Sequence, residues 1–289
     1  MDGWIIIDKP TGIFSRTCAA KIGRMIDTKK FGHIGTLDPM ASGVLPIAFG
    51  NATKMIPFVE DISDGKKEYT FSMQFGFETD TLDITGTTIT QDDFIPDDKD
   101  INSVLSGFIG KKQQIPPMYS AVHINGQRAY NIARQGKNID VPPRNIEIFD
   151  LEFLGKTDKS WNFRVVCSRG TYVRSLARDI AKKMNAIATV DSIHRTQTNG
   201  FRIENAIKLD FLENLFNNGH SIKDYLMPTD FVLGDIPVIN LDDESAIFYK
   251  NGGFIRRTEP DGIFRIYTQN TFIGIGTVKD NSLRPKRTI

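Results

Sequence analysis

The most regular hydrophobic pattern in the chain is an alternation over residues 68–76. Every second side chain there is apolar or aromatic, and the apolar set consists of Tyr69, Phe71, Met73 and Phe75. A period of two residues is typical of a strand with one face in the core. Another largely apolar segment, residues 161–167, ends at a turn over residues 168–170. We predict a strand for each of these two segments.

Two other segments have helical spacing. Residues 15–30 begin near Ser15 or Thr17, either of which is a suitable N-cap, and end in two lysines at the expected carbonyl end. Residues 171–184 form a second amphipathic segment, with Tyr172 and Arg174 in its first turn. The apolar faces comprise Cys18, Ile22, Met25 and Ile26 in the first helix, and Val173, Leu176, Ala177, Ile180 and Met184 in the second.

Shorter elements complete the pattern. Residues 101–110 predict a short helix, and residues 114–136 predict a proline-broken loop, a strand, an Asn-Gly turn and a helix. Beyond residue 229 the pattern changes to short strands and turns. We therefore expect a large domain over residues 1–228 and a small one over residues 229–289. A domain as short as the second is only marginally stable on its own.

The composition excludes several classes of protein. The chain has 289 residues, of which 40% are hydrophobic, enough for a sizeable core. No stretch approaches the roughly 18 consecutive apolar residues of a membrane span, and the N-terminus lacks the features of a secretory signal. Cys18 and Cys167 are too few for a disulfide framework and lack zinc-ligand spacing. We expect a soluble cytoplasmic protein without a bound metal, and two buried thiols.

The net charge of the chain does not by itself favour binding to polyanions. Lys and Arg total 36 against 35 Asp and Glu, for a net charge of +1. A nucleic-acid partner would therefore need basic residues that are segregated on the surface. Basic residues do gather at 29–30, 111–112 and 284–287, and acidic residues gather at 92–100. Ordinary solvated faces explain these clusters equally well from charge alone.

The segment at residues 31–54 is rich in glycine and looks like a loop, yet it surrounds one carboxylate, Asp38, with apolar neighbours: Leu37, Pro39 and Met40. It is either a tight turn that contains an aspartate or a backbone shaped so that a ligand can approach the carboxylate. Taken singly, the other candidate residues also have ordinary explanations. These are an exposed turn for His33, the core for Tyr69 and a surface ion pair for Arg174.

Taken together, the motifs resemble the TruB-type tRNA pseudouridine synthases. Six motifs occur in the family's order over most of residues 5–205: DKPTGIFS at 8–15, GHIGTLDPMASGVL at 32–45, KEYTFSMQFG at 67–76, TDTLDITG at 79–86, QIPPMYSAVHINGQRAYNIARQG at 114–136 and CSRGTYVRSLARDI at 167–180. The resemblance implies an α+β fold with a mixed, mainly antiparallel sheet flanked by helices. It also implies a small C-terminal PUA-like domain, rich in β-strands, and conversion of uridine 55 in the T arm of tRNA to pseudouridine.

The resemblance also implies the catalytic residues. Asp38 would be the essential residue, with Arg174 paired to its carboxylate and Tyr69 packed on the target base. The reaction detaches uracil from the ribose at N1 and rejoins it through C5, so no redox change occurs and no cofactor is expected. A guanidinium nearby would keep a carboxylate charged among apolar neighbours. Covalent addition to the nucleotide and removal of the ribose 2' proton both remain open as the role of the carboxylate.

Four further residues are implied to contact the RNA or to support the site. His33 would fill the space left by the flipped base, Tyr172 and Ile193 would wall the uracil pocket, and Lys9 would support the loop that carries Asp38. The expected partner is the T-arm stem-loop of tRNA, with the acceptor stem on the C-terminal domain, and we expect a monomer. The chain departs from the family at Ile193 and His194, where Leu and Arg are usual, so we expect a weakened phosphate contact.

Three alternatives remain. An RNA-folding factor that opens the tRNA elbow has no need of a carboxylate, so Asp38, Tyr69 and Arg174 together disfavour a purely non-catalytic protein, although both activities can coexist. A guide-RNA-dependent relative is disfavoured by the short N-terminus and by the lack of long basic tails, which favour the stand-alone bacterial type. A structural protein without a substrate would require six ordered motifs to be accidental.

Overall fold

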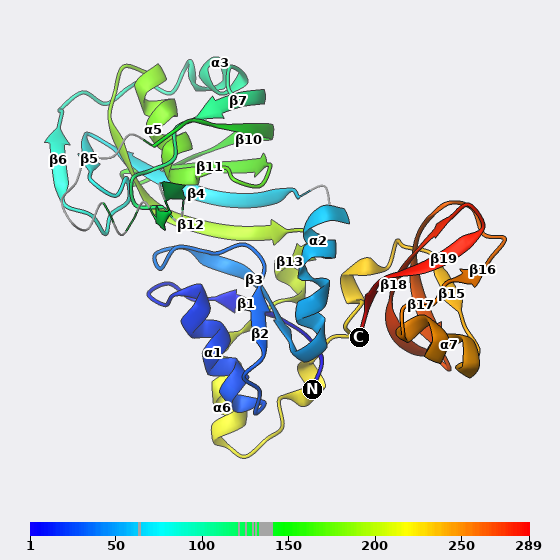
Figure 1. Cartoon of the computed structure of the whole chain (residues 1–289). Coiled ribbons are helices and arrows are strands. Elements are labelled where there is room, and N and C mark those ends of the chain that lie inside the picture. Colours follow the sequence, from blue (N-terminus) through cyan, green and yellow to red (C-terminus); the bar gives the residue numbers. More distant parts are fainter. Residues whose placement is uncertain (63–64, 121, 125, 129, 131, 133–140) are drawn as a thin grey trace.

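The computed structural model describes residues 1–62, 65–120, 122–124, 126–128, 130, 132 and 141–289 (Figure 1). The larger unit of the fold is a ten-stranded sheet with helices packed on it. A five-stranded sheet near the C-terminus forms a separate module beside it. Among the described residues, no helix has the length and apolar character needed to cross a membrane.

The large sheet is mixed but mainly antiparallel. Its strands are β1 (Gly3–Lys9), β2 (Phe31–His33), β3 (Ser42–Phe49), β4 (Lys67–Phe75), β7 (Gly110–Gln114), β10 (Arg144–Thr157), β11 (Ser160–Cys167), β12 (Ala188–Thr198), β13 (Phe201–Arg202) and β14 (Ile207–Lys208). Their order is β14-β1-β3-β12-β4-β11-β10-β7, with β2 paired to β3 and β13 to β12. The pairs β1 with β14 and β3 with β12 are parallel, and the other described pairs are antiparallel. The predicted α+β class is confirmed.

Strand β12 joins the two halves of this sheet. On one side it pairs with β3, where Arg195 lies opposite Gly43, and on the other it pairs with β4, where Arg195 lies opposite Tyr69. Figure 1 shows β12 between the half that contains β1 and β3 and the half that contains β4, β11 and β10. Asp38 lies just before β3. The pairing of β12 with both β3 and β4 therefore brings the segment around Asp38 close to the strand that carries Tyr69.

The helices bury the apolar faces that the sequence pattern indicated. Helices α1 (Ser15–Met25) and α6 (Leu209–Asn217) share a core with one face of β1 and β3, whereas α2 (Ile56–Ile62) and the 3-10 helix η1 (Gly50–Met55) belong to the opposite face. Burial on both faces explains why β1 is apolar at consecutive positions. Helices α3 (Ile101–Ser106) and α5 (Val173–Lys183) pack on the other half of the sheet. The strands predicted at 68–76 and 161–167 and the helix predicted at 171–184 are confirmed.

Three local predictions need correction. The segment at 31–54 looks like a loop, but most of it forms β2, β3 and η1. The first helix ends at Met25 and not near the two lysines. Ser15 is not its N-cap: Phe14 occupies that position, and the Ser15 hydroxyl bonds to the backbone of Leu37.

Two small hairpins lie outside the main sheets: β5 (Phe77–Thr79) with β6 (Thr88–Gln91), and β8 (His123–Ile124) with β9 (Gln127–Arg128). The second hairpin contains the strand expected within residues 114–136. The turn residue Asn125 and most of the helix predicted there lie outside the described residues. Three 3-10 turns complete the connections of the chain: η2 (Ile203–Asn205), η3 (Lys223–Tyr225) and η4 (Phe231–Leu233).

The C-terminal module contains β15 (Val238–Asn240), β16 (Ile255–Arg256), β17 (Gly262–Thr268), β18 (Thr271–Lys279), β19 (Ser282–Thr288) and α7 (Asp243–Lys250). The chain just before it is buried against both units. The indole Nε1 of Trp4 donates to the carbonyl of Thr229 at 2.8 Å, and Arg265 forms an ion pair with Asp230 at 2.9 Å. Phe272 and Ile275 of β18 belong to the same apolar cluster as Trp4. The boundary predicted near residue 229 remains a proposal.

Candidate active site

Asp38 lies in the connection from β2 to β3, and the backbone on both sides of it is held by hydrogen bonds. The hydroxyl of Ser15 bonds to both backbone groups of Leu37, at 2.9 Å each. The N–H of Gly12 donates to the carbonyl of Pro39 at 2.7 Å. The Asp38 side chain itself is 42% exposed. A carboxylate that a substrate can reach is therefore mounted on a fixed backbone.

Arg174 supplies the positive charge next to Asp38. One of its terminal nitrogens lies 2.6 Å from Oδ2 of Asp38, although the Arg174 side chain is only 4% exposed. The guanidinium also donates to the carbonyls of Thr81, at 2.8 Å, and Tyr119, at 3.0 Å. Its Nη1 lies 3.4 Å from Oδ2 of Asp83. Because the guanidinium has several anchors besides Asp38, its position does not depend on that carboxylate alone.

Asp83 is the second carboxylate of this network, and it is buried. Its Oδ1 accepts hydrogen bonds from the Thr81 hydroxyl and from the Thr85 backbone N–H, each at 3.0 Å, and also from the Thr85 hydroxyl. Its Oδ2 faces Arg174. Donors therefore surround Asp83 on both oxygens, which suits a side chain with two acceptor oxygens. The motif at 79–86 was recognised in the sequence, but its spacing gave no sign of this contact.

Tyr69 is 7% exposed and lies opposite Arg195 in the sheet. Arg195 is fully buried and donates to the carbonyls of Val44 and Gly35, at 2.8 Å each. Burial raises the pKa of Tyr69 to about 12, and the adjacent Arg195 opposes this shift only in part. Burial also lowers the pKa of Arg195. The Tyr69 hydroxyl is therefore protonated at neutral pH, and its ring belongs to the same apolar cluster as Leu37.

Lys9 and His33 flank the segment that carries Asp38. The Lys9 amine has no exposed surface and donates to the carbonyls of Pro10 and Ile13, at 2.9 Å each, and of Pro39 at 3.5 Å. Burial lowers the pKa of Lys9 to about 8. His33 is half-buried at the end of β2, which corrects its interpretation as an exposed turn residue. Its pKa is lowered by burial and by nearby arginines, so the ring is neutral at neutral pH.

Tyr172 and Ile193 complete the predicted set. Tyr172 is the N-cap of α5, and the side-chain amide of Gln114 pairs with its backbone, accepting from the N–H at 2.8 Å and donating to the carbonyl at 3.1 Å. Burial raises the pKa of Tyr172. Ile193 is 6% exposed and packs in the cluster that contains Tyr69. Both residues therefore lie on the side of the sheet that α5 covers.

Comparison with known proteins matches the chain on both sides of residue 229. Residues 23–173 match the family described as TruB family pseudouridylate synthase, N-terminal domain, and residues 237–289 match Pseudouridine synthase II TruB, C-terminal. The tRNA pseudouridine synthase B of Ehrlichia chaffeensis is 36% identical over 99% of this chain and 99% of its own length. The chain belongs to the TruB family. The enzyme of the same name from Francisella philomiragia subsp. philomiragia is 39% identical over 99% of this chain and 94% of its own.

A solved structure shares the fold of this TruB-family chain. It is a chain from the structure of an H/ACA RNP bound to a substrate RNA containing 2'-deoxyuridine. The TM-score is 0.69 and the sequence identity 22%, with 99% of this chain and 84% of that chain covered. At this identity the likeness supports the pseudouridine synthase fold alone.

The TruB-family fold brings four of the predicted residues together around the Asp38 carboxylate. Arg174 contacts Asp38 directly, and the charge of Asp38 acts on the pKa of Lys9, Tyr69 and Tyr172. Sequence reasoning missed four residues that hold this arrangement: Ser15, Asp83, Gln114 and Arg195. All four lie in or beside the recognised motifs, but each acts on a partner that is distant in sequence. The catalytic and binding roles of the predicted residues remain proposals.

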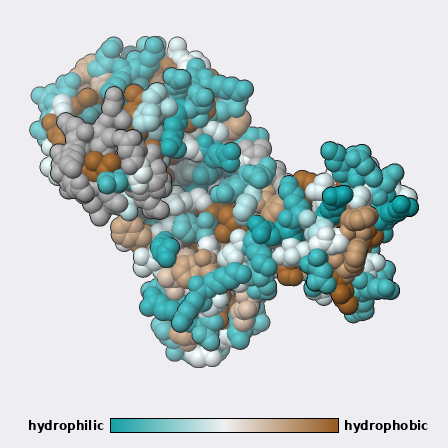
Figure 2. Space-filling view, in the orientation of Figure 1, coloured by the Kyte–Doolittle hydropathy of each residue, from teal (hydrophilic) through white to brown (hydrophobic). Residues whose placement is uncertain are grey.

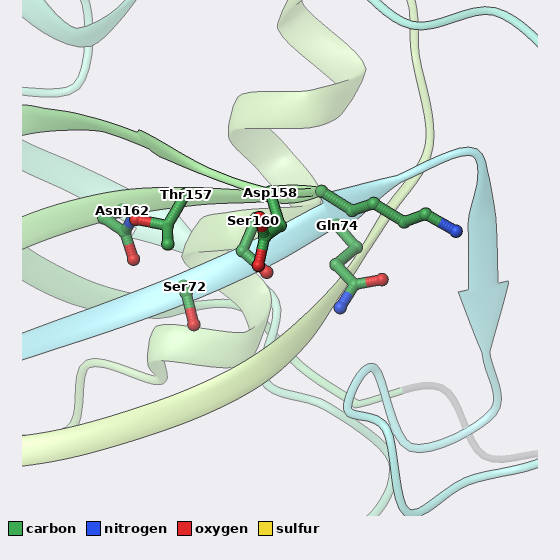
Figure 3. Close-up of a pocket in the computed structure, with 7 residues that line it drawn as sticks. Ser72, Gln74, Thr157, Asp158, Ser160 and Asn162 are labelled. Atoms are coloured by element: carbon green, nitrogen blue, oxygen red, sulfur yellow. The ribbon is translucent and has the colours of Figure 1, made fainter.

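Asp191 is another aspartate of this TruB-family chain, and its partners differ from those of Asp38. Asp191 accepts hydrogen bonds from Ser72, from Ser160 and, at 3.1 Å, from Gln74. These side chains border a polar hollow of about 470 Å³ on the face of β4 opposite Tyr69 (Figure 3). The described donors to Asp191 are neutral, in contrast to the guanidinium beside Asp38.

Proposed function

We propose that this chain is a tRNA pseudouridine synthase that isomerises uridine 55 in the T arm of tRNA to pseudouridine. Full-length relatives at 36% and 39% identity carry the name tRNA pseudouridine synthase B. The observation that carries the proposal is the 2.6 Å ion pair between Arg174, which is buried, and Asp38, which is half-exposed. This pair sets a buried positive charge beside a carboxylate that is exposed enough for a nucleotide to reach.

Asp38 acts on the ribose side of the target nucleotide in this proposal. Either it adds to the nucleotide or it removes the 2' proton, and in both routes the bond from C1' to N1 of uracil breaks. The detached base turns and C5 bonds to C1', while the bond to Asp38 breaks in the first route or the 2' proton returns to the ribose in the second. C5 then loses its proton to solvent, and N1 gains one. Both routes begin with the carboxylate as an anion, and a neighbouring guanidinium such as that of Arg174 favours this form. Reactant and product are isomers, so the proposed reaction consumes no cofactor.

Aromatic side chains hold the uracil while it is detached. The Tyr69 ring packs on the base, and its protonated hydroxyl does not repel electron-rich uracil oxygens. Tyr172 and Ile193 limit the access of water, which would otherwise leave an abasic site. Extruding a stacked base costs a few kcal/mol. His33, as a neutral ring, offsets part of that cost by stacking in the gap.

The C-terminal module binds the acceptor stem in this proposal, as a PUA-like domain. Strand β19 exposes three basic side chains: Arg284, Lys286 and Arg287. The module also exposes apolar side chains, as Figure 2 shows. Such a mixture of cations and apolar contacts suits RNA backbone and sugar surfaces. We propose a cytoplasmic monomer, and light scattering of the protein with and without tRNA tests that state.

Release of tritium from C5 of uridine tests the reaction directly. The substrate is an unmodified T-arm stem-loop labelled at that carbon, and formation of the new carbon bond must expel the label. We expect release by the wild type, no release by Asp38→Asn, and tRNA affinity that is nearly unchanged in that variant. Asp191→Asn serves as the matched control and should release label at the wild-type rate. Residual activity of Asp38→Asn above about a thousandth of wild type would refute the central role of Asp38, and binding without any release by the wild type would favour an RNA-folding factor.

A further inference from the structure

The neighbours of Asp38 in the chain are held by the end of β1, the start of α1 and the turn between them. These supply Lys9, Ser15 and Gly12, respectively, and each of these residues bonds to a residue next to Asp38. Gly12 and Lys9 reach the carbonyl of Pro39, which follows Asp38. Ser15 reaches Leu37, which precedes it. The residues on both sides of Asp38 are therefore tied to the connection between β1 and α1.

Ser15 makes the more complete of these contacts. Its hydroxyl accepts from the N–H of Leu37 and donates to the carbonyl of Leu37, at 2.9 Å each. Ser15 is 1% exposed and Leu37 is 4% exposed. A hydroxyl can act as donor and acceptor at once, so this one side chain satisfies both backbone groups of one residue. Water has little access to replace it.

Removal of the hydroxyl would leave two buried backbone groups without partners. Such groups are rare because their desolvation is not compensated. The residues after Ala41 are held in strand β3. The backbone groups of Leu37 can therefore reach water only if the segment that carries Asp38 shifts toward solvent. A shift of this kind moves the Asp38 carboxylate relative to Arg174, which is held separately by the carbonyls of Thr81 and Tyr119.

We propose that Ser15 is a positioning residue for the reaction: it sets the place of Asp38 through the backbone of Leu37 and does not touch the substrate. The proposal rests on the function proposed above for Asp38. Rates of well-oriented reactions fall by about a hundredfold when a reacting group is misplaced by about 1 Å. We therefore expect Ser15→Ala to slow the chemical step and to leave RNA affinity in place.

The test compares single-turnover release of tritium from the T-arm stem-loop with the dissociation constant of the same RNA. For Ser15→Ala we expect a fall in the single-turnover rate of about 10- to 100-fold, with a dissociation constant within about twofold of wild type. Thr189→Val is the matched control, because the Thr189 hydroxyl is equally buried and donates to the carbonyl of Phe77 at 2.9 Å, away from Asp38. It should lower the melting temperature without slowing release.

Three outcomes would overturn the role of Ser15: a rate within about threefold of wild type, an equal loss of rate in Thr189→Val, or a loss explained by weaker binding. If Ser15→Ala fails to fold, the same comparison is made with Ser15→Cys, whose thiol is a weak donor and acceptor and should give an intermediate rate. Asp38→Asn is assayed alongside. Release by that variant would refute the proposed function itself, whereas no release by Asp38→Asn and a normal rate in the Ser15 variants would refute only the positioning role.

Discussion

Asp83→Asn tests whether the buried carboxylate behind Arg174 matters for the site. Donors face both Asp83 oxygens: threonine groups face Oδ1, and the Arg174 guanidinium faces Oδ2. An asparagine has one acceptor and one donor end. Turned one way, the NH₂ group faces the Thr85 backbone N–H, and turned the other way it faces the Arg174 guanidinium. In both orientations Arg174 loses a negatively charged partner.

The expected magnitude follows from burial. Asp83 and Arg174 are 5% and 4% exposed in their side chains, and the closest N–O distance is 3.4 Å. Breaking a buried ion pair by removing one charge costs about 3 to 5 kcal/mol. The carbonyls of Thr81 and Tyr119 still bond to Arg174, so we expect about 2 to 4 kcal/mol of lost stability. Arg174 should then shift relative to Asp38, and we expect a 10- to 100-fold slower single-turnover rate, on the order of 1.4 to 2.7 kcal/mol in the barrier.

Urea denaturation and single-turnover tritium release measure the two effects. The matched control is Asp230→Asn, because Asp230 is also buried and pairs with an arginine, Arg265, but lies at the junction with the C-terminal module. It should lose comparable stability and convert the isolated T-arm stem-loop at the wild-type rate. The reasoning would be refuted if Asp83→Asn were as stable as wild type, or if both variants slowed release equally.

Three further predictions concern other parts of the molecule. Tyr69→Phe keeps the ring and should retain most activity. Tyr69→Leu should lose about 10- to 100-fold in kcat/KM, because the aromatic contact with the base is lost. Full activity of both variants would show that Tyr69 is only a core residue. Gly43→Ala should lower the free energy of unfolding by about 2 to 4 kcal/mol, measured with urea. The φ angle of Gly43 is +101°, and an added Cβ would lie 2.2 Å from the carbonyl oxygen of Arg195. Unchanged stability would contradict the close packing of β3 and β12. The pKa of His33 is lowered in the folded state, so the unfolded chain binds more protons below pH 6.5 and stability should fall as the pH decreases through that region. His33→Gln should show a smaller loss over the same range, and identical pH profiles would argue against a half-buried, neutral His33.

Much of the secondary structure could be predicted from local sequence patterns. The alternation in β4, the amphipathic face of α5 and the mixed secondary structure follow from hydrophobic period, because side-chain direction in strands and helices repeats at fixed intervals. Motif resemblance pointed to Asp38, Tyr69 and Arg174. In the structure, Asp38 and Arg174 form an ion pair with an N–O distance of 2.6 Å. The extent of α1 and the strands within 31–54 were missed, because tertiary contacts there outweigh local turn signals.

The tertiary structure decided which groups hold the site. Ser15 has the sequence character of a helix cap but bonds to Leu37, and Asp83 has that of a turn residue but faces Arg174. Both contacts join segments that are far apart in sequence, and hydrophobic period carries no information about the partner of a buried polar group. The sequence by itself therefore determined the elements and the chemical groups available. The packing of β3, β4 and α5 around β12 determined which of those groups meet, because a buried donor or acceptor must find its partner wherever the fold places one.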